Sequence, residues 1–360
     1  MTSAVKVAVI FGGRSTEHDV SCRSAAGVLQ ALNRARYDVV PIRITLDGVW
    51  VAGCDRPGAT IDVATLLEMT PEDPRRRTTP LESLFGVLDV LRTVDVVLPC
   101  LHGPYGEDGT LQSVLELAGI PYVGSGVLAS AASMDKEFTK KILAADGIAV
   151  ADGVVLRGPD DVVTAAERER LGLPVFVKPA RGGSSIGVSR VDDWAALDAA
   201  VAVARRSDTK VLVEAAVPGR EIDLGVLEQP GGQVVVSPSL EIKVGSQHVF
   251  FDYEAKCRDG STTFVIPADL DEATSALLDE TAIRVFRALG CAGLLRVDFF
   301  LPVVDGRVVP TVNEVNTMPG LTAVSQFPLM WRAAGIPYDE LLDLLLRTAL
   351  DRAAIPALHS

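Results

Sequence analysis

Four polar side chains near the C-terminus alternate with apolar neighbours in two runs that are otherwise typical of β-strands. Arg296 and Asp298 lie in the first run, and Glu314 and Asn316 lie in the second. Residues two apart on a strand share a face, so pairing of the two strands would bring two carboxylates, an amide and a guanidinium together. Hard oxygen ligands of this kind suit Mg²⁺ that carries substrate phosphates. A strand pair with one face in water is the alternative, but the Thr-Met-Pro-Gly at 317–320 favours a binding face.

A glycine- and serine-rich loop in the middle of the chain is a second candidate for phosphate binding. It follows an apolar run, begins at Lys178 and contains Ser184 and Ser185. Successive backbone N–H groups in such a loop can surround a phosphate group. The lysine precedes the glycines and no helix follows directly, so the loop is not a Walker motif, and on its own it is equally typical of a hairpin turn. Lys178 and Lys136 are candidate cations for the phosphates.

Two further segments follow predicted strands, at the strand ends where α/β sheets bind ligands. Glu17 comes after the first strand, and His102 begins a glycine-rich stretch after the strand that starts at residue 94. A carboxylate at Glu17 could pair with a substrate ammonium group. Residues 248–264 carry Lys256 and predict either a mobile loop that closes over phosphates and excludes water or a plain surface loop.

The elements that must position these residues alternate between strands and helices, which predicts a fold of mixed α/β and α+β class. A strand at 5–11 begins an N-terminal α/β, Rossmann-like domain at 1–124, which is interrupted by a loop-rich insertion at 52–79. We expect a central α+β domain at 125–214 and a C-terminal domain at 215–360. The other predicted strands are 39–44, 94–98, 121–123, 154–156, 175–179, 188–191, 211–214, 222–227, 234–242, 294–301 and 308–315, and the main predicted helices are 111–118, 135–146, 193–206, 273–289 and 338–352.

Composition narrows the class of protein. A chain of 360 residues predicts two or three domains. Its net charge of −13 argues against a nucleic-acid partner, because phosphate backbones require a basic surface. The five cysteines lack C-x-x-C spacing and read as reduced thiols, and the four histidines form no zinc pattern. No apolar run is long enough to span a bilayer and the N-terminus lacks a signal-peptide layout, so we expect no membrane association and a cytoplasmic protein.

Taken in order, the motifs resemble those of the D-alanine–D-alanine ligase family, which is part of the ATP-grasp superfamily. The resemblance covers nearly the whole chain except the insertion, and it implies a three-domain ATP-grasp fold. The segments that carry it are Glu17-His18, His102-Gly-Pro-Tyr-Gly-Glu-Asp-Gly, Met134-Asp-Lys136, Lys178-Pro-Ala-Arg-Gly-Gly-Ser-Ser, Tyr253-Glu-Ala-Lys256, Arg296-Val-Asp298 and Asn313-Glu-Val-Asn-Thr-Met-Pro-Gly320.

The resemblance implies a two-step reaction for peptidoglycan precursor synthesis. ATP phosphorylates the carboxylate of one D-alanine, and the amine of a second D-alanine attacks the acyl phosphate. It also implies two Mg²⁺ (or Mn²⁺) ions and a homodimer formed through the N-terminal domain. The resemblance implies that Glu17 and His102 bind the first substrate and that Ser325 binds the second. For ATP, it implies phosphate binding by Lys136, Lys178, Ser184, Ser185 and Lys256, adenine binding by Glu214 and the backbone near Val217, and ribose binding by Glu221. It also implies metal binding by Asp298, Glu314 and Asn316, and stabilisation of the oxyanion by Arg296 and the Gly320 amide.

The chain departs from the family pattern directly after the lid lysine. Cys257 stands where many members carry a tyrosine that links the lid to the serine matching Ser184, and Phe251 stands where tyrosine is common. Cysteine is shorter and its thiol is a weak hydrogen-bond donor, so the lid should close with fewer polar ties. Three interpretations of this departure are open. It reflects neutral drift, a different second substrate such as D-lactate or D-serine, or an altered response to D-cycloserine.

Two other functions compete with this one. A different ATP-grasp ligase would lack the Glu17 and His102 motifs, which mark the D-alanine pocket rather than the shared ATP site. A non-catalytic nucleotide-binding protein would be expected to lose at least one of the four polar residues near the C-terminus, and all four are present.

Overall fold

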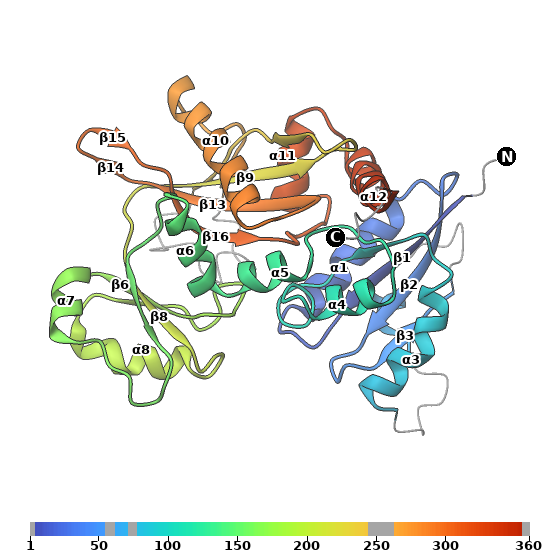
Figure 1. The fold of residues 1–360 in the computed structure, drawn as a ribbon, viewed down its shortest axis with the longest axis horizontal. Coiled ribbons are helices and arrows are strands. Elements are labelled where there is room, and N and C mark those ends of the chain that lie inside the picture. The colour runs from blue at the N-terminus through green and yellow to red at the C-terminus, as the bar shows by residue number, and fades with distance from the viewer. Residues whose placement is uncertain (1–3, 55–61, 71–77, 244–262, 355–360) are drawn as a thin grey trace, which may run out of the picture.

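The computed structural model describes residues 4–54, 62–70, 78–243 and 263–354. Its elements form three main sheets surrounded by helices, with one sheet in each of the three predicted segments (Figure 1). The boundaries that we predict at residues 124 and 214 stay predictions. No helix within these ranges is both long enough and apolar enough to cross a bilayer.

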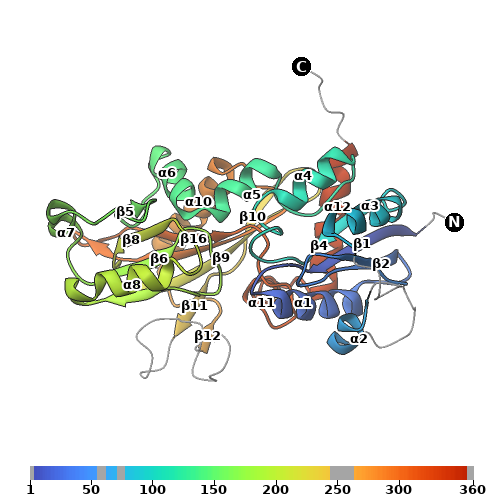
Figure 2. The same ribbon diagram turned by 90° about the horizontal axis from the view of Figure 1, so that it is seen from below.

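The first sheet lies near the N-terminus and has the strand order β3-β2-β1-β4. Its β1 pairs in parallel with β2 and β4, while β3 runs antiparallel to β2. Helices α1 and α12 cover one face through a shared apolar core, and α3 and α4 cover the other. The C-terminal helix α12 therefore packs on the N-terminal sheet, as Figure 2 shows. The elements are β1 (Val5–Gly12), α1 (His18–Ala31), β2 (Tyr37–Ile44), β3 (Trp50–Ala52), α2 (Val63–Leu67), α3 (Pro80–Leu91), β4 (Val96–Pro99), α4 (Thr110–Leu117) and α12 (Tyr338–Ala354).

The second sheet is antiparallel throughout, in the order β5-β8-β6-β7, and α8 packs on its apolar face. Helices α5 and α6 connect it to the first sheet, and the Asp135 side chain caps α6 by accepting from the Glu137 N–H. The elements are α5 (Val127–Met134), α6 (Lys136–Ala145), β5 (Gly153–Leu156), α7 (Ala165–Leu171), β6 (Val175–Pro179), β7 (Ser189–Val191), a 3₁₀ turn (Trp194–Ala196), α8 (Leu197–Ala204) and β8 (Val211–Ala215).

The third sheet has the order β12-β11-β9-β13-β16, with β10 beside β9, and its pairings are antiparallel. Helix α10 covers one apolar face, and the opposite face of β9, β13 and β16 is largely polar. The elements are β9 (Arg220–Glu228), β10 (Val234–Val236), β11 (Leu240–Lys243), β12 (Thr263–Val265), α10 (Glu272–Ala288), β13 (Leu294–Leu301), β14 (Val303–Val304), β15 (Arg307–Val308), β16 (Thr311–Asn316) and α11 (Gln326–Ala333).

Prolines divide two of the predicted strands. The run 234–242 forms β10 and β11 on either side of Pro238, and the run 308–315 is interrupted at Pro310 before β16. Proline has no N–H for the ladder, so neither strand continues through it. The predicted helix at 193–206 begins as a 3₁₀ turn, and the predicted insertion at 52–79 contains α2.

Candidate functional site

The two polar strand runs near the C-terminus pair as the alternation predicts. On the antiparallel β13 and β16, Arg296 lies opposite Asn316, and Asp298 lies opposite Glu314. Asn316 Nδ2 donates to Asp298 Oδ2 at 3.2 Å. The prediction that these four side chains converge on one face is confirmed.

Arg296 and Asp298 form a two-point contact on this face. Nε and Nη2 of the guanidinium donate to Oδ1 and Oδ2 of the carboxylate at 2.7 and 2.8 Å, a charge-assisted pair that fixes the plane of both groups. A second carboxylate, Asp223 on β9, lies 3.7 Å from Arg296 Nε and is 1% exposed. Burial alone would lower the pKa of Arg296, but the surrounding carboxylates raise it, so the side chain stays charged.

Lys136 links this polar face to the glycine-rich loop. It is the first residue of α6, and its Nζ donates to the Gly182 carbonyl at 2.8 Å and lies 3.5 Å from Glu314 Oε2. The ammonium group therefore lies between the loop that we predict to surround phosphate and the carboxylate that we predict to bind metal. A cation in this place can neutralise a phosphate oxygen.

Lys178 is the penultimate residue of β6 and is buried, as its apolar strand predicts. Its Nζ lies 2.7 Å from Glu214 Oε2, and the other oxygen of Glu214 lies 2.9 Å from Lys140 Nζ. Burial would raise the pKa of Glu214, but the two lysines lower it. The pKa of Lys140 is lowered to about 8, mainly by burial. Repulsion from Lys178 and Lys136 also lowers it, whereas the attraction of Glu214 raises it. The Glu214 carboxylate is thus occupied by lysines, and its predicted contact with adenine stays a prediction.

A direct contact joins the glycine-rich loop to the N-terminal sheet. Ser184 Oγ donates to Glu17 Oε1 at 2.5 Å, although the two residues are 167 positions apart. Ser184 and Ser185 both have left-handed backbones, with φ of +51° and +56°, a conformation that costs energy in residues other than glycine. A Cβ added to Gly183 would lie 2.5 Å from Glu17 Oε2, so a side chain at this position would displace the Glu17 carboxylate.

His102 and Glu107 hold the loop that follows β16. The His102 Nδ1–H donates to the Met318 carbonyl at 3.1 Å, and Glu107 accepts from the Met318 N–H at 3.0 Å and from the Gly103 N–H at 2.7 Å. Burial lowers the pKa of His102, which favours a neutral ring, and Ser24 Oγ lies 3.4 Å from its Nε2. Burial and repulsion from the Glu17 carboxylate raise the pKa of Glu107 to about 8.

The segment after Met318 carries the two residues predicted to meet the second substrate. Gly320 and Ser325 are close together, since a Cβ on Gly320 would lie 3.0 Å from Ser325 Oγ. Ser325 precedes α11, and its Oγ lies 2.6 Å from Thr322 Oγ1. The next residue, Gln326, donates to Asp223 Oδ2 at 2.9 Å, which ties α11 to the polar face.

The remaining predicted residues are placed as follows. Val217 lies between β8 and β9, and Glu221 is half-buried on β9, two residues before Asp223 on the same face of that strand. Three predicted residues, Lys256, Phe251 and Cys257, lie outside the described residues, so the lid stays a prediction from the sequence.

Three residues of this site were missed by sequence reasoning. Lys140 could have been suspected, because it lies one helical turn after Lys136. Asp223 could have been found by the two-residue alternation from Glu221 along the same strand. Glu107 lies inside the glycine-rich stretch, but nothing local indicates that its partner is Met318.

The donor set on the polar face fits Mg²⁺. Asp298 and Glu314 supply carboxylate oxygens and Asn316 an amide oxygen, and Mg²⁺ commonly takes one or two carboxylates together with substrate phosphates. Across the described ranges, no three His, Cys, Asp or Glu side chains gather as a complete metal site. A metal here would therefore depend on phosphate oxygens to complete its coordination.

The fold and the site define a class: an ATP-grasp enzyme, with lysines and a glycine-rich loop facing a hard-oxygen strand pair. Family models described as the D-ala D-ala ligase N-terminus and C-terminus match residues 6–125 and 142–347. The chain belongs to the D-alanine–D-alanine ligase family.

Relatives and solved structures agree with this membership. The chain is 52% identical to a D-alanine–D-alanine ligase of Nocardia farcinica over 98% of this chain and 99% of that protein, and 51% identical to one of Mycolicibacterium vanbaalenii over the same shares. Among solved structures, the VanG D-Ala:D-Ser ligase of Enterococcus faecalis has a TM-score of 0.78 at 34% identity and covers 96% of this chain and all of that chain. The D-alanine–D-alanine ligase of Coxiella burnetii also has a TM-score of 0.78, at 31% identity, over 97% of this chain and 95% of that chain.

Proposed function

We propose that this protein joins two D-alanines in an ATP-dependent reaction through a D-alanyl phosphate, supplying D-Ala-D-Ala for peptidoglycan precursors in the cytoplasm. The observation that carries the proposal is the convergence of one arginine, two carboxylates and an amide on one strand pair. Lys136 lies against this face, and Glu17 reaches the phosphate loop through Ser184. Phosphoryl transfer depends on positioning and charge neutralisation, which this arrangement supplies without a covalent nucleophile.

In the first step, the carboxylate of one D-alanine attacks the γ-phosphorus of ATP and ADP leaves. Glu17 would hold the substrate ammonium, with His102 beside it, and Arg296 would face the carboxylate. Lys136 and Lys178 would neutralise phosphate oxygens, while the loop that carries Ser184 and Ser185 encloses them. The backbone near Val217, Glu214 and Glu221 would contact adenine and ribose, and Lys256 would reach the transferring phosphate.

Two Mg²⁺ ions would be held by Asp298 and Glu314 and by Glu314 with Asn316. When bound, they neutralise charge on the β- and γ-phosphates. The two-point pair with Arg296 fixes the orientation of Asp298, so the arginine also positions one of these carboxylates.

In the second step, the amine of the second D-alanine attacks the acyl carbon, loses a proton, and expels phosphate as the C–O bond breaks. Arg296 and the Gly320 N–H would stabilise the tetrahedral oxyanion, and Ser325 would hold the carboxylate of the incoming substrate. The contacts of His102 and Glu107 with Met318 support this role, because they fix the backbone two residues before Gly320.

We also propose a homodimer formed through the N-terminal domain. Apolar side chains on α3 and α4 support it, since Phe85 is 60% exposed and Leu117 is 90% exposed. Light scattering behind a sizing column should give about twice the mass of the 38.1 kDa chain, and a monomer at micromolar concentration would contradict the proposal.

The proposed function is tested by ADP release that requires D-alanine, with the dipeptide identified by mass. Similar folds act on different second substrates, so D-alanine, D-serine and D-lactate are compared as acceptors in the parent and in Cys257→Tyr. We expect D-alanine to be preferred at neutral pH in both. A preference for D-lactate would overturn the D-alanine assignment, and no ADP release with any amino acid would support a non-catalytic nucleotide-binding protein instead.

A further inference from the structure

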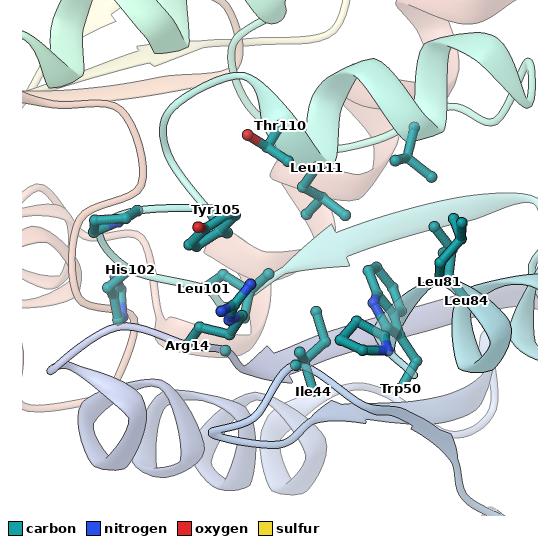
Figure 3. Close-up of a pocket in the computed structure, with 16 residues that line it drawn as sticks. Arg14, Ile44, Trp50, Leu81, Leu84, Leu101, His102, Tyr105, Thr110 and Leu111 are labelled. Carbon is teal, nitrogen blue, oxygen red and sulfur yellow. The ribbon is translucent and has the colours of Figure 1, made fainter. Parts of the chain in front are cut away.

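A cavity of about 270 Å³ opens beside the first sheet, on the side covered by α3 and α4 (Figure 3). Most of its walls are apolar. The apolar walls include Ile44, Trp50, Leu81, Leu84, Leu101 and Leu111.

One end of this cavity carries the positive charge of Arg14. The Arg14 guanidinium lies 4.9 Å from the centre of the Tyr105 ring, and the two side chains lie together in Figure 3. Among the residues that the structure describes, no Asp or Glu lines the cavity, although the chain has a net charge of −13. Within the described residues, Arg14 makes no ion pair, so its charge is available to a bound anion.

The cavity shares two walls with the predicted first-substrate end. Gly13 and Arg14 precede Glu17 in one loop, and the Gly13 carbonyl accepts from His18 Nδ1 at 2.7 Å. His102 lines the cavity and also donates to the Met318 carbonyl. A molecule in the cavity would therefore press on the two loops that position the D-alanine ammonium.

We propose that this cavity binds a small carboxylate with an aromatic or branched apolar body, and that its occupation is coupled to binding of the first D-alanine. The apolar walls would take the body of the ligand, and Arg14 would pair with its carboxylate. The coupling rests on the roles proposed for Glu17 and His102, whereas the binding site itself does not. Coupling between two sites is reciprocal, so each ligand must change the affinity of the other by the same factor.

Isothermal titration calorimetry with 4-phenylbutyrate tests the site, with neutral 4-phenyl-1-butanol as the matched probe. We expect Arg14→Met to weaken phenylbutyrate at least fivefold and the alcohol less than twofold. Leu84→Trp should fill the cavity and abolish binding of both. Arg23→Met, which removes an exposed arginine of α1 that does not line the cavity, should change neither. Absence of binding, or binding unchanged in Leu84→Trp, would overturn the proposal.

Repeating the titration with saturating D-alanine tests the coupling. We expect the dissociation constant of phenylbutyrate to change at least threefold, and the D-alanine affinity to change by the same factor. Equal constants with and without D-alanine would overturn the coupling, while loss of D-alanine-dependent ADP release in the parent would instead count against the proposed function. Dissociation of a dimer on adding phenylbutyrate would show that a second copy of the chain covers the cavity, and would also overturn the proposal.

Discussion

Replacing Arg296 by alanine should separate substrate binding from turnover. The guanidinium makes a two-point pair with Asp298 and lies 3.7 Å from Asp223, with only 14% of its side chain exposed. Loss of one oxyanion donor typically lowers turnover by about 10²–10³. We therefore expect Arg296→Ala to lower kcat by at least that factor while the affinity for a non-hydrolysable ATP analogue changes by less than about threefold.

The same substitution also leaves carboxylates without their cation, and breaking a buried ion pair typically costs about 3–5 kcal/mol of stability. Two controls separate this effect from catalysis. Arg220→Ala removes an arginine that makes an equivalent two-point pair with Glu241 at 2.8 Å for both contacts, and we expect it to lose stability but keep activity. The double variant Arg296→Met/Asp298→Asn removes both charges, and we expect it to recover thermal stability without recovering turnover.

The assay is D-alanine-dependent ADP release by a coupled enzyme system, with the folded fraction of each variant measured by circular dichroism. Arg296→Lys keeps the charge but loses the planar fork, so its activity should fall between those of the parent and the alanine variant. Near-normal kcat in Arg296→Ala would show that the assigned role of this arginine is wrong.

Three other perturbations follow from the site. The pKa of Glu107 is raised from 4.5 to about 8, so its carboxyl group destabilises the folded protein progressively as pH rises between those values. The melting temperature of Glu107→Gln minus that of the parent should therefore increase from pH 5 to 8.5, and a constant difference would contradict this. Lys140→Met leaves Lys178 as the only cation among the described residues on Glu214, which is proposed to contact adenine. The KM for ATP should therefore rise about tenfold, or ~1.4 kcal/mol, and an unchanged KM in steady-state kinetics would refute it. Ser184→Ala removes a hydrogen bond to the Glu17 carboxylate worth about 1.5–3 kcal/mol, so the KM for the first D-alanine should rise at least tenfold in steady-state kinetics, and an unchanged KM would contradict the link between these two residues.

Local patterns predicted the part of the site that depends on neighbours along the chain. Alternation on a strand is a local property, so the common face of Arg296 and Asp298 could be read directly from the sequence. The interruption at Pro238 was equally local, and the proline rule would have divided that strand. Lys140, one helical turn after Lys136, could have been found from helical spacing, but it was missed.

Contacts between distant segments could not be read in this way. The partner of Glu107 lies 211 residues away at Met318, and no pattern around either residue indicates the pairing. Asp223 joins the polar face because β9 lies beside β13, and that order depends on the whole sheet. Likewise, the packing of α12 on the first sheet brings the C-terminal helix to the N-terminal core, which the predicted domain division did not suggest.

Transfer of oxygen from the substrate carboxylate to phosphate tests the central claim most directly. D-Alanine labelled with ¹⁸O in both carboxylate oxygens is incubated with ATP and the enzyme, and the released phosphate is examined by mass spectrometry. A D-alanyl phosphate intermediate predicts one ¹⁸O in each phosphate, because the oxygen that attacked the γ-phosphorus leaves with it. Dipeptide formation accompanied by unlabelled phosphate would contradict the proposed chemistry at the Arg296–Asp298 site.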